Sequence, residues 1–208
     1  MQLALFPLRL VVFPFEKINL HIFEERYKQL IKECSLENKP FGIPSYIDGR
    51  VMPIGTQVLT AEIVKEYPGG EMDIKCEAQS LFEIKNYYGP VADKLYDSGD
   101  VQPYPIENDA QTDKLVMLIE LVNELFRRLQ VKEVSYDTDT ENLPFLLGHM
   151  LGLSLSQQYE LIRFRKDSAR VDFLISYLKQ LEPKKKIEEV ILRSINVNGH
   201  FKNIIPPK

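Results

Sequence analysis

Residues 1–103 place apolar side chains at every second position over short segments, the pattern of strands with one buried face. Residues 71–78 alternate Met, Ile, Cys and Ala with charged residues, and residues 56–67 carry a similar pattern before the turn at 68–70 (Pro-Gly-Gly). These two segments predict a β-hairpin. Residues 81–88 and 91–96, separated by a Gly-Pro step, predict two further strands.

One amphipathic helix interrupts the strand-rich region. From Glu24 to Asn38, apolar residues recur at helical spacing with lysines and glutamates on the opposite face, and Pro40 follows the run. This segment is therefore expected to pack one apolar stripe against a sheet or barrel.

After Pro105 the period changes to that of α-helices. The longest apolar stripe, over residues 109–130, predicts the first helix of this region. Start signals for the remaining helices are Pro144, the capping box Ser154–Gln157, Asp167 or Ser168, and Pro183. We therefore expect a β domain over residues 1–103 and a helical subdomain of about five helices over residues 104–208.

Composition and charge narrow the class of protein without identifying its function. Of the 208 residues, 44% are hydrophobic and 27% are charged, which are ordinary values for a globular protein. The net charge of −4 is uneven, because the last 25 residues carry six cations and two carboxylates and the remainder carries −8. Nucleic-acid binding is therefore disfavoured for the body of the chain, while the basic tail keeps RNA binding as an alternative.

The sequence also bears on location and redox state. No apolar stretch approaches the ~20 residues that cross a bilayer, and the N-terminus lacks the regions of a signal peptide. We expect a cytoplasmic protein without a membrane partner. Cys34 and Cys76 are too few for a disulfide framework and are expected to be buried, reduced thiols, although the sequence also allows one disulfide between them.

Motifs for catalysis or metal binding are absent from the sequence. His21, His149 and His200 lie far apart, and none has a metal-ligand spacing to a second His or Cys. The chain has neither a phosphate-binding Gly-rich loop nor a nucleophile elbow. We therefore expect no enzyme activity, no cofactor and no metal.

The strongest sequence signal lies near the N-terminus. The run LFPL at residues 5–8 is followed by VVFP at 11–14 and by LHIFEERY at 20–27. In these segments, in FGI at 41–43 and in IGT at 54–56, the chain resembles the N-terminal substrate-binding domain of Lon protease. A weaker resemblance continues through the helical half, so that it covers nearly the whole chain.

The resemblance implies an α+β fold, with a PUA-like β pseudobarrel that contains one inserted helix, followed by an α-helical bundle. It implies a non-catalytic module that binds exposed apolar segments of other proteins, in a stand-alone form without the ATPase and protease domains of Lon. The implied partners are unfolded or extended protein segments, and a separate protease or ATPase is a further partner that the resemblance allows.

Nine residues of the resembling motifs are interpreted as structural, although His21, Glu24 and Arg26 would alternatively suit a charged site. They are Phe6, Pro7, Pro14, His21, Phe23, Glu24, Arg26, Tyr27 and Gly55. The chain departs from the family pattern at Phe15, where a glycine is common. It also lacks the Gly and Arg common in the stretch that corresponds to residues 78–84, so a role tied to that Arg is in question.

Aromatic residues near turns and strand ends are the remaining candidates for binding. Core packing accounts for most such rings, but some must be exposed. Exposed rings beside strand edges bind extended peptides through buried area and backbone pairing. The candidate peptide-binding residues are Phe15, Tyr67, Tyr87 and Tyr88.

Overall fold

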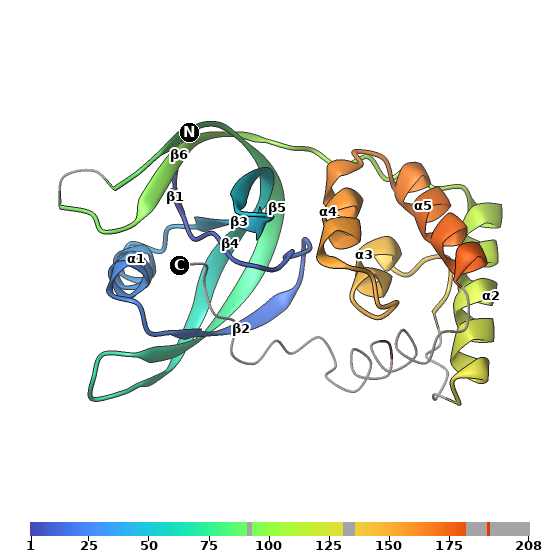
Figure 1. Ribbon diagram of the computed structural model, residues 1–208, viewed down its shortest axis with the longest axis horizontal. Coiled ribbons are helices and arrows are strands. Elements are labelled where there is room, and N and C mark those ends of the chain that lie inside the picture. Colours follow the sequence, from blue (N-terminus) through green and yellow to red (C-terminus); the bar gives the residue numbers. More distant parts are fainter. Residues whose placement is uncertain (91–92, 131–135, 182–190, 192–208) are drawn as a thin grey trace. The chain divides into compact units, whose positions relative to one another are not determined.

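The computed structural model of the chain describes residues 1–90, 93–130, 136–181 and Ile191. It forms two compact units, one from Met1 to Pro105 and a second that begins at Ile106 (Figure 1). The predicted helix after Pro183 and the basic tail lie outside the described residues. In the described part, no helix is both long and apolar enough to cross a membrane.

A five-stranded barrel forms the first unit. Its described elements are β1 (Gln2–Leu5), β2 (Lys17–Ile22), α1 (Glu25–Leu36), β3 (Phe41–Ile47), β4 (Arg50–Glu66), β5 (Met72–Tyr88) and β6 (Asp97–Pro103). The barrel order is β5, β4, β3, β1 and β6, and β6 pairs back onto β5 to close it, while β2 is an additional strand on β5. The structure therefore confirms the predicted barrel with one inserted helix.

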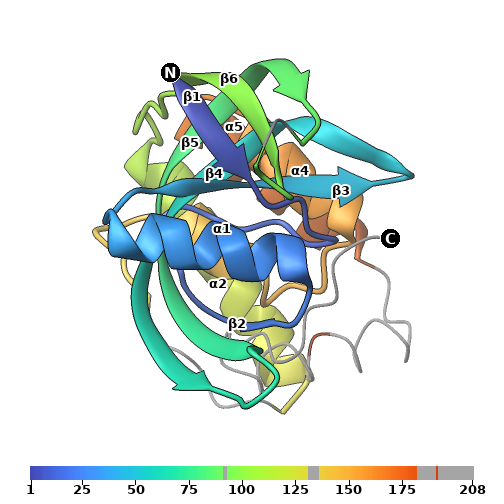
Figure 2. The same ribbon diagram turned by 90° about the vertical axis from the view of Figure 1, so that its left-hand side faces the viewer.

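The barrel closes because β5 is long enough to hold two partners on one edge. Residues 72–77 pair with β2, and residues 82–88 pair with β6. Along the opposite edge β4 pairs with both halves, with register shifts that bend the two strands. Figure 2 shows this curvature of β4 and β5 behind α1. The predicted hairpin is confirmed, and the strand expected over 81–88 is the continuation of β5.

The strand expected over residues 91–96 is wrong for its described part. Residues 93–96 contain no strand, and β6 begins at Asp97. The backbone of Asp93 and Leu95 bonds to the side chain of Gln29, which lies 64 and 66 positions away, instead of to a neighbouring strand. Local periodicity carries no information about such a contact.

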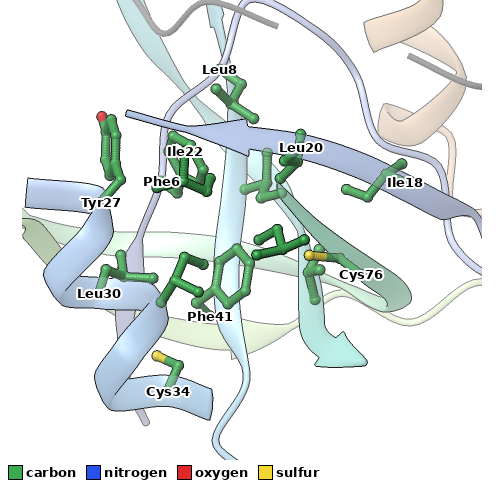
Figure 3. Close-up of a cluster of buried hydrophobic side chains, with 14 of the residues drawn as sticks. Phe6, Leu8, Ile18, Leu20, Ile22, Tyr27, Leu30, Cys34, Phe41 and Cys76 are labelled. Carbon is green, nitrogen blue, oxygen red and sulfur yellow. The ribbon is translucent and has the colours of Figure 1, made fainter. Parts of the chain in front are cut away.

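The apolar stripe of α1 packs against the barrel, as its periodicity predicts. Tyr27, Leu30, Ile31 and Cys34 are each at most 6% exposed. Figure 3 shows Leu30 and Cys34 on the helix on the side of Phe41 from β3. Burying one large apolar side chain of this kind stabilises a fold by about 1.5–3 kcal/mol, so this stripe fixes α1 to the barrel.

Two glycines make room for the ring of Phe82 inside the barrel. A Cβ atom added at Gly42 would lie 2.6 Å from Phe82 Cζ. At Gly55 it would lie 2.7 Å from the same atom and 2.8 Å from the Cα of Pro44. Phe82 is 2% exposed and packs with Leu3. The absence of a side chain at both glycines is therefore a packing requirement.

Phe15 lies just before β2 in a left-handed backbone conformation, with φ of 68°. Its N–H donates to the Ala78 carbonyl oxygen at 3.1 Å, and the residue is 64% exposed. A left-handed conformation costs an L-residue roughly 1–2 kcal/mol, a penalty that glycine avoids. The sequence departure at Phe15 thus introduces backbone strain at an exposed ring.

We expect Phe15→Gly to raise the free energy of unfolding by about 1 kcal/mol, because it removes this strain and exposes little buried surface. Urea unfolding followed by circular dichroism measures the change. Phe15→Ala is the matched control, since it removes the ring but keeps the Cβ atom and the strain. A less stable Phe15→Gly variant would contradict the expectation.

Four described helices form the second unit, and they confirm the predicted helical bundle. They are α2 (Thr112–Arg128), α3 (Leu143–Gly148), α4 (Leu155–Arg163) and α5 (Asp167–Gln180). The capping box of α4 is confirmed, since the Gln157 N–H donates to Ser154 Oγ at 3.3 Å and the Ser154 N–H donates to Gln157 Oε1 at 2.9 Å.

The cap expected for α5 is wrong, because its N-cap is Lys166. Asp167 lies in the first turn and accepts a hydrogen bond from Arg170 Nη1. The N–H and the hydroxyl of Ser168 both donate to the carboxylate of Asp109 at 2.9 Å. Both side chains are thus engaged in contacts other than a cap.

Arg170 on α5 is fully buried and ties the end of α4 to α5. Its Nε donates to the Leu161 carbonyl oxygen at 2.9 Å, and its Nη2 donates to that of Phe164. Nη1 pairs with Asp167 at 2.5 Å, and the guanidinium lies 4.6 Å from the ring centroid of Phe145. One side chain therefore satisfies two carbonyl groups at a helix end, where helices lack internal partners.

Candidate binding surface around helix α1

Helix α1 lies between the ends of two β-connections, the β4–β5 turn and the β5–β6 loop (Figure 1). Gln29 holds the loop from the helix side. Its Nε2 donates to the Asp93 carbonyl oxygen at 2.8 Å, and its Oε1 accepts from the Leu95 N–H at 2.8 Å. An amide side chain offers the same donor and acceptor as a peptide group, so Gln29 takes the place of a neighbouring strand.

Glu33, one turn further along α1, fixes the same loop by charge. Lys94 Nζ and the Tyr96 hydroxyl both donate to its Oε2, each at 2.5 Å. Partial burial by itself would raise the pKa of this carboxyl, but the hydrogen bonds from Lys94, Tyr96 and Gln29 hold it below its ordinary value. Burial and the hydrogen bond to Glu33 raise the pKa of Tyr96. The segment 93–96 is thus pinned to α1.

Lys28 attaches the β4–β5 turn to the other side of α1. It is only 7% exposed, and its Nζ donates to the Gly69 carbonyl oxygen at 3.0 Å and to Glu25 Oε1 at 2.9 Å. A buried ammonium group needs such partners to offset its lost hydration. The helix therefore positions both the turn and the loop.

Two open cavities lie along α1, and residues of this helix line both of them. The first has a volume of about 380 Å³ and the second about 510 Å³. The first is lined by Gln2, Leu3, Ala4, Glu33, Cys34, Glu37, Lys39, Pro40, Lys94, Tyr96 and Ser98. The second is lined by Glu25, Lys28, Gln29, Lys32, Gly69, Gly70, Asp93, Lys94 and Leu95. Both volumes lie in the range of small-ligand pockets. We call the two cavities together the α1 groove.

Two exposed leucines lie in or near the segments that form the α1 groove. Leu95 lines the second cavity and is 55% exposed. Leu36 precedes Glu37, which lines the first cavity, and it is 87% exposed. Sequence periodicity did not mark either residue, because both stand outside the regular apolar stripes.

The four predicted aromatic residues do not gather at one place. None of the four lines either cavity. Tyr87 and Tyr88 follow each other in β5 and therefore point to opposite faces of the sheet. Their hydroxyls donate to Asp97 and Asp100 respectively, each at 2.5 Å.

Tyr67, at the β4–β5 turn, belongs to a separate aromatic cluster with His21 and Phe23. The His21 ring centroid lies 5.8 Å from that of Tyr67 and 6.2 Å from that of Phe23. Lys65 Nζ lies 4.3 Å from the Tyr67 ring centroid. Asp73 accepts from the Tyr67 hydroxyl at 2.8 Å and from His21 Nδ1 at 2.7 Å. Because an ionised carboxylate can only accept, Nδ1 carries the proton.

These hydrogen bonds give a testable pH dependence. The bonds from His21 and Tyr67 hold the pKa of Asp73 below its ordinary value. Their stabilising contribution is therefore present above the ordinary value of about 3.9 and is lost as the pH falls through the folded-state pKa. Since the His21 and Asp73 side chains are 36% and 39% exposed, this contribution stays below about 1 kcal/mol.

We expect Tyr67→Phe to raise the pKa of Asp73 toward its ordinary value, as read from an NMR titration of the carboxyl carbon. Tyr88→Phe is the matched control, because it removes the hydroxyl that bonds to Asp100 instead. An unchanged Asp73 titration in Tyr67→Phe would contradict this assignment.

Among the residues of the resembling motifs, Phe6, Pro7, Pro14, Tyr27 and Gly55 are buried, whereas Phe23 is 40% exposed. Phe6 is buried, and its ring centroid lies 3.9 Å from that of Tyr27. Arg26 Nε donates to Glu24 Oε2 at 2.8 Å, and its guanidinium lies 4.5 Å from the Tyr27 ring centroid. Glu24 is the N-cap of α1 and makes no side-chain cap.

The two cysteines are free, buried thiols. Burial raises the pKa of Cys34 to about 11 and that of Cys76 to about 12. Both thiols are therefore protonated at neutral pH and react poorly as nucleophiles. Within the described ranges, no group of three or more His, Cys, Asp or Glu residues could hold a metal ion.

Comparison with known proteins gives a consistent result. The sequence profile of the ATP-dependent protease La (LON) substrate-binding domain matches residues 2–198. A crystal structure of a Lon N-terminal domain protein from Xanthomonas campestris superposes with a TM-score of 0.64 at 22% identity, covering 85% of this chain and 98% of that one.

The N-terminal domain of Lon protease from the Mycobacterium avium complex superposes with a TM-score of 0.68 at 14% identity, covering 88% of this chain and 100% of that one. A search of curated protein sequences gives no significant match. At these identities, the two structures establish a shared fold.

Proposed function

Because the chain belongs to the family of the ATP-dependent protease La (LON) substrate-binding domain, we propose that it recognises protein substrates without catalysing a reaction. Its ligands are exposed apolar segments of unfolded or extended proteins. The observation that carries this proposal is the profile match over residues 2–198. A fold hosts many functions, so the proposal needs a site.

The α1 groove is the site that we propose for these segments. Support comes from Leu95, which lines the second cavity and is 55% exposed, and from Leu36, which is 87% exposed and directly precedes the cavity-lining Glu37 in the sequence. Exposed apolar side chains next to concave surface gain free energy when a ligand covers them. Covering either leucine contributes up to about 2 kcal/mol.

A non-catalytic role agrees with the chemistry of the groove. The Cys34 thiol, which lines the first cavity, has a pKa raised to about 11 by burial and is a poor nucleophile at neutral pH. Lys94 pairs with Glu33 and Lys28 pairs with Glu25, so these ammonium groups are engaged. A protonated thiol and paired ammonium groups can contact a bound segment, but they are poor nucleophiles.

Isothermal titration with a reduced, carboxymethylated protein that cannot refold tests the proposal. We expect a dissociation constant on the order of 1–10 μM, and no binding to the native form of the same protein. The absence of heat at a protein concentration of about 100 μM, with the chain folded, would contradict it. Binding of RNA instead, with a strong dependence on salt, would favour the alternative function.

The position of the site is tested with Leu36→Glu and Leu95→Glu. Each places a charge where an apolar contact is expected, and we expect at least about tenfold weaker binding of the unfolded protein. Leu146→Glu on α3 is the matched control, because Leu146 is 46% exposed and belongs to the second unit. Equal weakening by all three substitutions would contradict the α1 groove as the site.

A further inference from the structure

Strand β1 has an open backbone edge on the side that faces β3, a place that we call the β1–β3 seam. The Met1 amino group donates to the Val101 carbonyl oxygen at 3.0 Å, and the Val101 N–H donates to the Met1 carbonyl oxygen at 2.8 Å. In an antiparallel pair, alternate residues bond to the same neighbour. Leu3 and Leu5 therefore bond to β6, while the backbone groups of residues 2 and 4 point the other way.

On that other side, β1 pairs with β3 at Leu5 and Gly42 only. The Phe6 N–H donates to the Gly42 carbonyl oxygen at 2.7 Å, which sets the parallel register. Continued toward the N-terminus, this register requires the N–H of residue 40 to donate to the Gln2 carbonyl oxygen. Residue 40 is proline, which has no N–H, so the ladder stops.

Open backbone groups remain at the end of this ladder. Among the described residues, the pairing of β1 with β3 stops at Leu5 and Gly42, so the N–H groups of Gln2 and Ala4 and the Gln2 carbonyl oxygen have no partner in β3. The first cavity, of about 380 Å³, occupies this place and is lined by Gln2 and Ala4 on one side and by Pro40 on the other. The proline thus leaves the Gln2 carbonyl oxygen at this cavity without its in-register donor.

A second polar group at this cavity also has no partner. Ser98 lies opposite Ala4 in the register, lines the cavity and is 8% exposed. Within the described part of the chain, its buried Oγ has no hydrogen-bond partner. A buried hydroxyl without a partner costs roughly 1–3 kcal/mol. Rotation about its one side-chain torsion moves the hydroxyl between staggered positions, so an entering amide can pair with it.

The charges around the cavity are balanced. Glu33 pairs with Lys94 at 2.5 Å, and Glu37 pairs with Lys39. Neither pair leaves a net charge for an ionic ligand to meet. The site therefore favours an uncharged ligand with backbone-like donors and acceptors.

We propose that the β1–β3 seam binds an extended, uncharged segment of a substrate protein as an added strand along Gln2–Ala4. This inference rests on the proposed function and names how the segment is held. Backbone pairing does not depend on side chains, so it admits many sequences. Three residues of β1 span about 10 Å, so the seam takes a short stretch of the segment.

The probe is the blocked tetrapeptide acetyl-Ala-Val-Ala-Val-amide, with the same peptide methylated at its backbone nitrogens as the matched control. We expect binding on the order of 1 mM for the first peptide and at least about tenfold weaker binding for the second. Amide hydrogen exchange followed by NMR gives the direct readout. Exchange at Ala4 should slow at least about tenfold with the peptide, while exchange at Leu3, already paired with β6, stays unchanged.

Ala4→Pro tests the same edge from the protein side. Proline is tolerated where its missing N–H faced no partner, so we expect a folded variant with at least about tenfold weaker peptide binding. If Ala4→Pro does not fold, Ser98→Ala tests the same site. It should weaken binding of the blocked peptide while leaving the fold intact. Equal binding of both peptides, or unchanged exchange at Ala4 with bound peptide, would overturn the proposal.

The two proposals fail separately in these experiments. Binding of unfolded protein without protection of Ala4 rejects the added strand and leaves substrate recognition in place. Protection of Ala4 by the blocked peptide without binding of unfolded protein supports the seam and rejects the proposed function.

Discussion

Arg170→Met should lower the free energy of unfolding of the second unit by about 3–5 kcal/mol, the usual range for breaking a buried ion pair. The substitution leaves Asp167 without its buried cation, and it leaves the carbonyl groups of Leu161 and Phe164 without their donor. Methionine replaces most of the side-chain volume, so the loss reports on hydrogen bonding and charge rather than on a cavity. Thermal and urea unfolding followed at 222 nm measure it.

Arg163→Met is the matched control for this result. Its side chain is 54% exposed and pairs with Glu160, and pairs at the surface contribute about 0–1 kcal/mol. We expect Arg170→Lys to lie between the two, because an ammonium group cannot donate in the fixed directions of a guanidinium. A loss below about 1 kcal/mol for Arg170→Met would mean that the buried network is not a main support of the unit.

Gly55→Ala should destabilise the barrel by about 3 kcal/mol, near the upper end of the usual cost of overpacking. The added methyl group would lie 2.7 Å from Phe82 Cζ, 2.8 Å from Pro44 Cα and 2.9 Å from the Ile43 carbonyl oxygen. Two of these neighbours are backbone atoms of the paired strand β3, which cannot move without disturbing the ladder. Urea unfolding of the variant gives the change.

Gly42→Ala separates a side-chain clash from a backbone clash. Its nearest neighbours are side-chain atoms only, Phe82 Cζ at 2.6 Å, Phe82 Cε1 at 2.8 Å and Leu3 Cδ2 at 2.9 Å. Adding Phe82→Leu should therefore recover more than about 1 kcal/mol in Gly42→Ala and less in Gly55→Ala, as measured by a double-mutant cycle. Equal recovery in both would contradict the role assigned to the β3 backbone.

The elements that the sequence predicted well are those fixed by local patterns. The apolar stripe of α1, the β4–β5 hairpin around its Pro-Gly-Gly turn and the capping box at Ser154 depend on residues a few positions apart. Each pattern has a physical cause within one or two turns of chain.

The contacts that the sequence did not reveal join distant residues. Gln29 and Glu33 pass as solvent-facing positions of an amphipathic helix, yet they bind Asp93, Leu95 and Tyr96. A Gln or Glu on the polar face of a helix is ordinary, so its presence gives no signal of a partner 60 or more positions away.

The aromatic residues predicted to bind peptides do not line the α1 groove, for the same reason. Nearness to a turn indicates that an aromatic residue is exposed, but it does not indicate which residues it meets in space. Tyr67 meets His21 and Phe23, whereas Tyr87 and Tyr88 point to opposite faces. In the sequence, Pro40 indicates the end of a helix, while its effect on the β1–β3 ladder depends on a register that only the folded barrel sets.

The pairing of β1 with β6 also sets the order in which the chain can finish folding on the ribosome. Met1 and Val101, which bond to each other, are 100 positions apart. At a synthesis rate of about 5–20 residues per second, β1 waits roughly 5–20 s before β6 exists. During that interval β1 has no partner on its β6 edge. The step that completes the barrel is therefore timed by translation rather than by the intrinsic speed of strand pairing, and slower codons between β5 and β6 would lengthen the life of an open, association-prone intermediate.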